Sequence, residues 1–239
     1  MRVKSNRYFG ALGISLSVVL VTPAAHAARL GGAYYVDDAE IGSVGSCEVE
    51  SWGSFAANGD RVMVFNPACV YNLGRPVEIG MSLIGLRAGG EWSSIFAASA
   101  KTALAKQQGI MPGIAVAGVV TYDLRSGSLE SLILNVPFTW DLSKTVRVNV
   151  NAGAQYNARE QVLFPLGGLG VSWNFLPKWS VIAETFAIMA PQEANPRWQS
   201  GVRYSPAKDV DCDIVYGRNI TGERSNWLTL ALTMRLGDR

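Results

Sequence analysis

The stretch Val146–Tyr156 reads VRVNVNAGAQY and alternates apolar with polar residues from end to end. Valine, alanine and tyrosine occupy one set of alternate positions, while arginine, asparagine, glycine and glutamine occupy the other. Because successive side chains of a β-strand point to opposite faces, this period of two predicts a strand with one apolar and one polar face. After the N-terminal leader we find no helical period of comparable length.

The same alternation recurs along the chain, for example in Val77–Leu83, Leu132–Phe138 and Leu228–Leu236. Together with the turn-forming residues between the segments, it predicts about twelve strands. The expected ranges are 47–57, 60–72, 77–87, 91–104, 112–123, 128–140, 145–156, 162–174, 179–189, 196–205, 209–218 and 225–236. The connections are short, and nothing indicates a second domain.

Two all-β architectures accommodate these strands: a soluble β-sandwich or barrel, and a transmembrane barrel whose apolar face meets lipid. The strands, about 10 to 13 residues long, match tilted membrane spans better than ordinary globular strands. Charged residues make up only 17% of the chain, below the roughly 25% of soluble domains. Six aromatic residues fall near strand ends, as in an interfacial girdle: Trp140, Trp173, Phe175, Trp179, Tyr204 and Trp227. We therefore predict an antiparallel transmembrane β-barrel of about twelve strands with short turns, whose partner is the lipid bilayer.

The first 27 residues resemble a secretory signal peptide. A basic beginning with Arg2, Lys4 and Arg7 precedes an apolar stretch and the sequence Ala25-His26-Ala27, which matches an A-x-A cleavage site. We expect an exported protein of the bacterial outer membrane, with residues 1–27 removed, an extended segment over 28–46 and the barrel over 47–239. The alternative is an N-terminal membrane anchor, for which the apolar stretch is short.

Removal of this leader changes the chemistry that the chain can support. The leader carries three basic and no acidic residues, so 18 basic and 19 acidic residues remain. It also contains the only histidine, His26, which excludes histidine-dependent nucleophile pairs and histidine-ligated metal sites from the mature chain. We expect no cofactor and no metal. With no long basic run, we expect no nucleic-acid partner.

Two of the three cysteines flank the first predicted hairpin, whose turn we place at Asn58-Gly59. Cys47 and Cys69 then lie within one residue of facing each other across the two strands. This predicts a disulfide, with a single-residue bulge absorbing the mismatch, although two free thiols are the alternative. Cys212 alternates with apolar residues and is expected to be a small hydrophobic side chain.

Short motifs also resemble a known family of outer-membrane proteins. Tyr35-Val36-Asp37-Asp38-Ala39 with Gly42, followed by Cys47-Glu48-Val49-Glu50, is similar to the start of the phenol-degradation meta-pathway family. The stretch Ile214–Gly222 and the strand Trp227–Leu236 resemble uncharacterised rhizobial relatives of that group. The resemblance implies an outer-membrane barrel associated with transport of small hydrophobic or aromatic compounds. Val36 stands where the family commonly has threonine, and the chain lacks a terminal phenylalanine.

Charged residues on the polar faces are the candidate functional residues. Eight are expected to line the lumen and set its selectivity: Glu78, Lys101, Arg147, Glu184, Arg203, Asp211, Asp213 and Arg235. Because four acids oppose four bases, a conducting barrel would have weak ion selectivity and admit small neutral or hydrophobic molecules. The acidic group Asp37, Asp38 and Glu40 is expected to be a solvated lead-in, with cation or ligand binding inside the barrel as the alternative.

The expected function is a passive channel or transporter of the outer membrane, and not an enzyme. A structural barrel that conducts nothing is the alternative, because charges in a narrow lumen can pair and block it. A membrane-embedded hydrolase or acyltransferase is disfavoured by the missing histidine.

Overall fold

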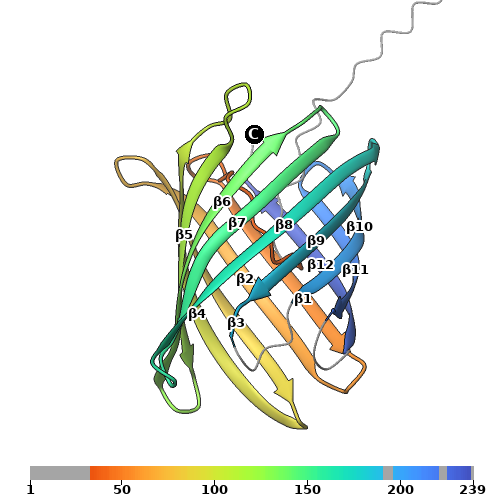
Figure 1. Ribbon diagram of the computed structural model, residues 1–239. Coiled ribbons are helices and arrows are strands. Elements are labelled where there is room, and N and C mark those ends of the chain that lie inside the picture. The colour runs from red at the N-terminus through yellow and green to blue at the C-terminus, as the bar shows by residue number, and fades with distance from the viewer. Residues whose placement is uncertain (1–32, 191–195, 221–224, 238–239) are drawn as a thin grey trace, which may run out of the picture.

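The computed structural model describes residues 33–190, 196–220 and 225–237. It is a closed barrel in which each strand pairs antiparallel with its neighbours in the sequence, and β1 pairs with β12 to close the wall (Figure 1). The strands are β1 (Cys47–Ala56), β2 (Arg61–Asn72), β3 (Pro76–Ala88), β4 (Glu91–Ala105), β5 (Gly113–Asp123), β6 (Ser128–Asp141), β7 (Val146–Asn157), β8 (Val162–Leu176), β9 (Trp179–Ile188), β10 (Arg197–Ala207), β11 (Val210–Asn219) and β12 (Asn226–Leu236).

The predicted all-β barrel of twelve strands is confirmed. Every expected strand is present, and each boundary lies within two residues of its expected position. Each strand is predictable because the alternation is local to it. Closure of the wall pairs the backbone N–H and C=O groups that the edges of an open sheet would leave exposed. Over the described ranges, no helix is long and apolar enough to cross a membrane.

The two faces of the wall differ as the alternation predicts. Large apolar side chains such as Met81, Leu134 and Ile214 are exposed on the outside. Polar and charged side chains such as Asn149 and Arg203 are buried inside. This inversion of the usual soluble pattern suits a lipid environment, because exposed apolar area on this scale destabilises a protein in water.

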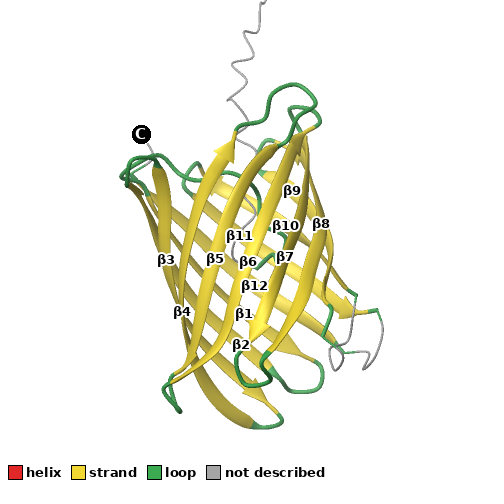
Figure 2. Ribbon diagram, turned by 60° about the vertical axis from the view of Figure 1, so that its left-hand side comes forward, coloured by secondary structure: helices red, strands yellow, loops and turns green. Residues whose placement is uncertain are grey.

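Both termini of the barrel lie at one end, which we call the terminal end. Cys47 at the start of β1 is paired with Leu236 at the end of β12. The two views show the long strands tilted around the barrel axis and joined by short connections (Figure 2). Strand tilt of this kind is required to close a sheet into a barrel.

The first hairpin contains the predicted disulfide. Cys47 and Cys69 are direct partners in the ladder and form the bond, with their Cα atoms 4.0 Å apart. The predicted bulge is absent from this ladder, which runs without a register shift. The extra residue lies in the turn instead: the Ala56 N–H donates to the Asp60 carbonyl oxygen, and Gly59 has a φ of 91°. A left-handed glycine of this kind is typical of three-residue hairpin loops, so the expected two-residue turn was wrong.

Aromatic side chains gather on the outside near the terminal end. Trp173 and Phe175 end β8, and Trp179 at the start of β9 packs against Tyr204 with ring centroids 4.5 Å apart. Trp227 differs from the expected girdle, because its indole N–H donates to the Gln199 side-chain oxygen inside the barrel. Trp227 lies two residues before the buried Thr229 in β12, so the alternation of the strand places both side chains on the inner face.

Candidate functional site

The N-terminal segment, residues 33–46, lies inside the barrel. Figure 1 shows this segment, red to orange, within the ring of strands. Tyr34, Val36, Asp38 and Ala39 are all buried, and the Asp38 side chain is only 1% exposed. The expectation of a solvated acidic lead-in is therefore wrong, because the barrel wall supplies partners for the acidic side chains that a sequence pattern does not reveal.

Side chains of the wall hold the main chain of this segment. The Glu184 carboxylate accepts hydrogen bonds from the backbone N–H groups of Tyr35 and Val36, at 2.6 and 3.0 Å. Asn151 both accepts from the Asp37 N–H and donates to the Asp37 carbonyl oxygen, at 2.8 and 2.7 Å. The segment thus satisfies main-chain groups with inward-facing polar residues, as buried backbone requires.

Two further hydrogen bonds extend this attachment. The Ala39 N–H donates to the Thr139 hydroxyl oxygen at 2.8 Å, and the Gln199 side chain donates to the Ala33 carbonyl oxygen at 2.8 Å. These partners come from β6 and β10, so the attachment covers a broad arc of the inner wall.

Glycines and apolar residues of β8 to β11 make room for the segment. A Cβ atom on Gly168 would lie 2.6 Å from a methyl carbon of Val36, and one on Gly201 would lie 2.7 Å from the Tyr34 hydroxyl. Tyr35 stacks on Phe186 with ring centroids 4.4 Å apart. Side chains at these glycine positions would occupy the space of the segment.

Two basic residues bind the acidic group of the segment. Lys101 Nζ lies 2.8 Å from Asp37 Oδ1 and 3.5 Å from Asp38 Oδ1. Arg147 contacts Glu40 at 2.7 Å and Asp38 at 3.7 Å. It also forms a 2.7 Å ion pair with Asp141 of the wall. The acidic motif is therefore occupied by internal ion pairs, and the described residues contain no group of His, Cys, Asp and Glu that could hold a metal ion.

A second ion-pair cluster lies within the wall itself. Arg203 pairs with Asp213 at 2.7 Å and with Asp211 at 3.5 Å. Arg235 bridges Asp211 at 2.8 Å and Glu48 at 2.7 Å. The Arg203 guanidinium also lies over the Tyr34 ring, 5.6 Å from its centroid, which links this cluster to the N-terminal segment.

The structure places all eight candidate lumen residues on the inner side of the wall, in three different roles. Arg147, Glu184 and Lys101 hold the N-terminal segment. The second cluster contains four of them: Arg203, Asp211, Asp213 and Arg235. Glu78 stands opposite Lys101 in the β3–β4 ladder and lines open space.

That open space is a cavity of about 210 Å³ between the N-terminal segment and strands β1 to β5. Small wall residues, including Ala68, Ser99 and Ala117, leave it unfilled. Its lining includes six carboxylates and one lysine: Asp37, Asp38, Glu40, Glu48, Glu50, Glu78 and Lys101. Carboxylates that line a pore attract cations and repel anions.

The expected balance of interior charge does not hold around this cavity. Glu48 and Glu50 were absent from the eight candidates, although their alternation with Cys47 and Val49 places them on the inner face. The other acids of the lining, Asp37, Asp38 and Glu40, belong to the N-terminal segment. That segment has no regular period, so the sequence does not predict that it lies in the lumen. The free space is consequently acidic.

A smaller cavity of about 10 Å³ shares Glu48, Ala68 and Glu78 with the larger one. Gly42 and Ser46 of the N-terminal segment and Arg235 of β12 also line it. A space of this size holds about one water molecule. The N-terminal segment thus narrows the lumen beside the start of β1.

Comparison with known proteins agrees with this architecture. A family model described as "Uncharacterised conserved protein UCP029691" matches residues 17–236. The chain belongs to this family. No curated protein matches the sequence.

Several solved structures share the fold of this chain. The NanC porin superposes with a TM-score of 0.61 at 9% identity, covering 79% of this chain and 100% of that one. The KdgM porin gives 0.61 at 6% identity, covering 78% and 98%. The outer membrane protein Omp33 of Acinetobacter baumannii gives 0.53 at 10% identity, covering 80% and 98%. At these identities the likeness shows the fold, which is that of outer-membrane porins.

Proposed function

We propose that the protein is a passive channel for small solutes in the bacterial outer membrane. We also propose that residues 1–27 direct its export and are then removed. The exposed apolar outer face and the porin fold support the membrane location. The absence of histidine from residues 28–239 supports a role other than histidine-dependent catalysis.

The acidic cavity on the β1–β5 side is the observation that carries this proposal. Its smaller neighbour shares Glu48, Ala68 and Glu78 with it and lies beside the start of β1, at the terminal end. A purely structural barrel has no need for a lumen cavity of about 210 Å³ that exposes carboxylates. Small residues on several neighbouring strands create this space together.

The solutes that we propose are small and neutral or hydrophobic, with cations admitted ahead of anions. Six carboxylates line the cavity, and three bases pair with some of them, namely Lys101, Arg147 and Arg235. The lining therefore keeps a net negative charge, and an anion meets a repulsive field. The resemblance to the phenol-degradation meta-pathway family supports small aromatic compounds as one class to test. In this proposal Glu78 and Lys101 set the selectivity of the free path, and Lys101 also holds the N-terminal segment. The other six candidate residues position the wall and the segment.

A structural barrel that conducts nothing is the second candidate. The paired charges and the N-terminal segment support it, because they fill the β6–β11 side of the lumen.

Planar-bilayer recording on the refolded mature protein separates these two functions. A channel should show conductance steps and, under a salt gradient, a reversal potential of the sign expected for cation selectivity. Glu50→Gln combined with Glu78→Gln should lower the cation-to-anion permeability ratio at least about twofold. Glu91→Gln is the matched control, since Glu91 is exposed at the β3–β4 turn. Absence of conductance from the wild type and from a variant lacking residues 33–42 would favour the structural barrel.

A further inference from the structure

The barrel wall is complete without the N-terminal segment. Strand β1 pairs with β12 from Cys47↔Leu236 to Ala56↔Trp227 and with β2 on its other edge. The segment takes no place in this ladder, so its departure would leave every strand pairing intact. The contacts that hold it come from wall side chains such as Glu184, Asn151 and Thr139.

Release of the segment would break its ion pairs at a small electrostatic cost. Asp37, Asp38 and Glu40 would leave Lys101 and Arg147, but water entering the lumen would solvate both sets of charges. A buried ion pair contributes little net stability, because desolvation offsets most of the attraction between the charges. Release would also expose the apolar contacts of Tyr34 with Ile182 and Val215, and the burial of these side chains favours the closed position.

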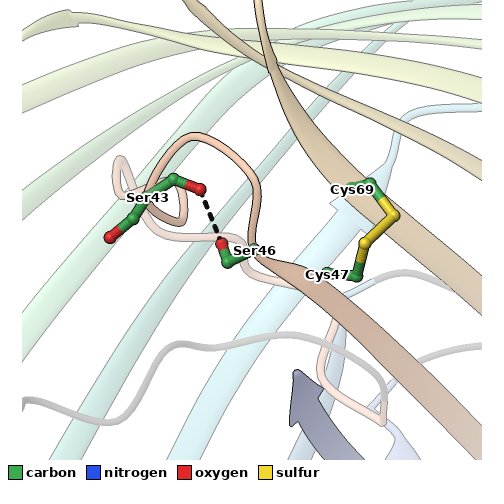
Figure 3. The surroundings of a disulfide bond; sticks show 4 residues. All are labelled: Ser43, Ser46, Cys47 and Cys69. Atoms are coloured by element: carbon green, nitrogen blue, oxygen red, sulfur yellow. Dashed lines mark hydrogen bonds between the residues drawn. A yellow bond between two sulfur atoms is a disulfide. The ribbon is translucent and has the colours of Figure 1, made fainter. Parts of the chain in front are cut away.

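The far end of the segment is firmly anchored. The Ser46 N–H and hydroxyl both donate to the Ser43 carbonyl oxygen, at 2.9 and 2.7 Å. The Gly45 N–H donates to the Val70 carbonyl oxygen at 2.8 Å, and the Val70 N–H donates to the Ser46 carbonyl oxygen at 2.9 Å. Figure 3 shows this turn directly beside the Cys47–Cys69 disulfide. The anchor therefore belongs to the β1–β2 hairpin, whereas residues 33–42 depend on side-chain contacts.

We propose that residues 33–42 are a gate of the lumen that swings about the Ser43–Ser46 turn. In the closed position they cover the inner faces of β6 to β11 and narrow the passage at Gly42. In the open position the space on the β6–β11 side joins the acidic cavity and gives a wider passage. This inference rests on the proposed channel function and assigns its regulation.

A disulfide lock tests the gate directly. An ideal Cβ on Gly170 lies 3.4 Å from the Cβ of Val36, close to the Cβ separation of natural disulfides. Val36→Cys with Gly170→Cys, in a Cys212→Ser background, should therefore form a bond that holds the segment against β8. Oxidation should lower the conductance at least about fivefold relative to the same protein after reduction, because the wider passage cannot form.

Controls isolate the lock from other effects of redox treatment. The two single-cysteine variants in the same background report the effect of each substitution. The Cys212→Ser protein reports the effect of reducing the native Cys47–Cys69 bond. A gel shift of the double variant, measured before and after reduction, confirms that the new bond has formed.

Removal of the gate gives the opposite test. Deletion of residues 33–42 should raise the single-channel conductance several-fold, to about that of an open twelve-strand lumen. Should the deleted protein fail to refold, Tyr35→Ala with Val36→Gly provides a milder release, because it removes the stacking on Phe186 and the contact with Gly168. Far-ultraviolet circular dichroism and heat-modified gel mobility report whether the barrel has formed.

The outcomes separate the gate from the channel. Lower conductance in the locked protein together with higher conductance in the released protein supports the gate. Equal conductance of the oxidised and reduced double variant overturns the gate and leaves the channel through the acidic cavity in place. Folded but silent barrels in every form, including the deletion, overturn the channel itself.

Discussion

The two sides of the lumen differ in how their interior space is filled. On the packed side, formed by the inner faces of β6 to β11, the N-terminal segment and buried ion pairs fill the interior. On the cavity side, formed by the inner faces of β1 to β5, small residues leave about 210 Å³ open beneath a row of carboxylates. The strands on both sides follow the same alternation of apolar and polar residues.

The polarity of each strand's inner face matches what that face contacts, either the N-terminal segment or the open cavity. Strand β9 has apolar residues on both faces: Ile182 and Phe186 are buried inside, while Val181 and Ala183 face outward. A strand that is apolar on both faces is typically covered on both sides, here by lipid and by the N-terminal segment. Strand β3 instead presents Glu78, Gly80 and Ser82 to the lumen, which suits contact with water.

The largest effect should come from removing a buried base on the packed side. Arg203→Met leaves Asp213 buried without its arginine partner, while Asp211 keeps Arg235, and the change should cost about 3–5 kcal/mol of the free energy of unfolding. Arg159→Met is the control at an exposed rim ion pair, where the change should stay within about 1 kcal/mol. Urea unfolding of the barrel in lipid vesicles measures both. Similar losses of unfolding free energy in the two variants would contradict the difference between a packed interior and a solvated rim.

Arginine substitutions should map the lipid face and both sides of the lumen. Leu134→Arg faces lipid and should cost about 2–4 kcal/mol. Ser99→Arg points into the acidic cavity, where the new charge has space and carboxylate partners, and should be tolerated. The sequence alone predicts that Asn149→Arg is tolerated too. The structure revises this expectation, because Asn149 is fully buried and accepts a hydrogen bond from Thr139 at 2.7 Å.

Insertion yield into vesicles and urea unfolding rank these three arginine variants. The expected order of stability places Ser99→Arg above Asn149→Arg and Leu134→Arg. Equal tolerance of Leu134→Arg and Ser99→Arg would contradict the assignment of the apolar face to lipid.

A smaller effect should follow from crowding the N-terminal segment against β8. Gly168→Ala places a methyl group 2.6 Å from a methyl carbon of Val36, and overpacking of this kind costs about 1–3 kcal/mol. Val36→Gly in the same chain should recover part of that loss. Gly85→Ala is the matched control, since its nearest contact would be an ordinary 3.7 Å to Trp92. Failure of Val36→Gly to rescue Gly168→Ala would place the strain in the wall alone.

The smallest change in stability should come from the cavity side. Glu50→Gln keeps a hydrogen-bonding oxygen for the Asn66 side chain, which donates to Glu50 at 3.0 Å. It also relieves repulsion from the neighbouring Glu48, so the free energy of unfolding should change by less than about 1 kcal/mol. A loss as large as that of Arg203→Met would show that Glu50 is a structural residue instead of part of an open lumen.

The sequence predicts some inner residues well and others poorly, for a local reason. Glu78, Arg147 and Asp213 follow the alternation of their own strands, and that rule alone places them on the inner face. The same rule places Glu48 and Glu50 on the inner face, although both lie near the start of β1. It also places Trp227 inside, although Trp227 lies near a strand end, where interfacial tryptophans are common.

The sequence by itself determined the twelve strands, the face that each side chain occupies and the partner of Cys47, because all three depend on a period of two and on pairing between adjacent strands. Only the tertiary structure decided that residues 33–46 turn into the lumen. That segment has no period, and its contacts join residues far apart in the chain, such as Tyr35 and Glu184 or Lys101 and Asp37. Burying an unpaired charge inside the closed wall costs free energy, so the charged side chains of the lumen are paired there. These pairs can form only after all twelve strands have closed into the wall.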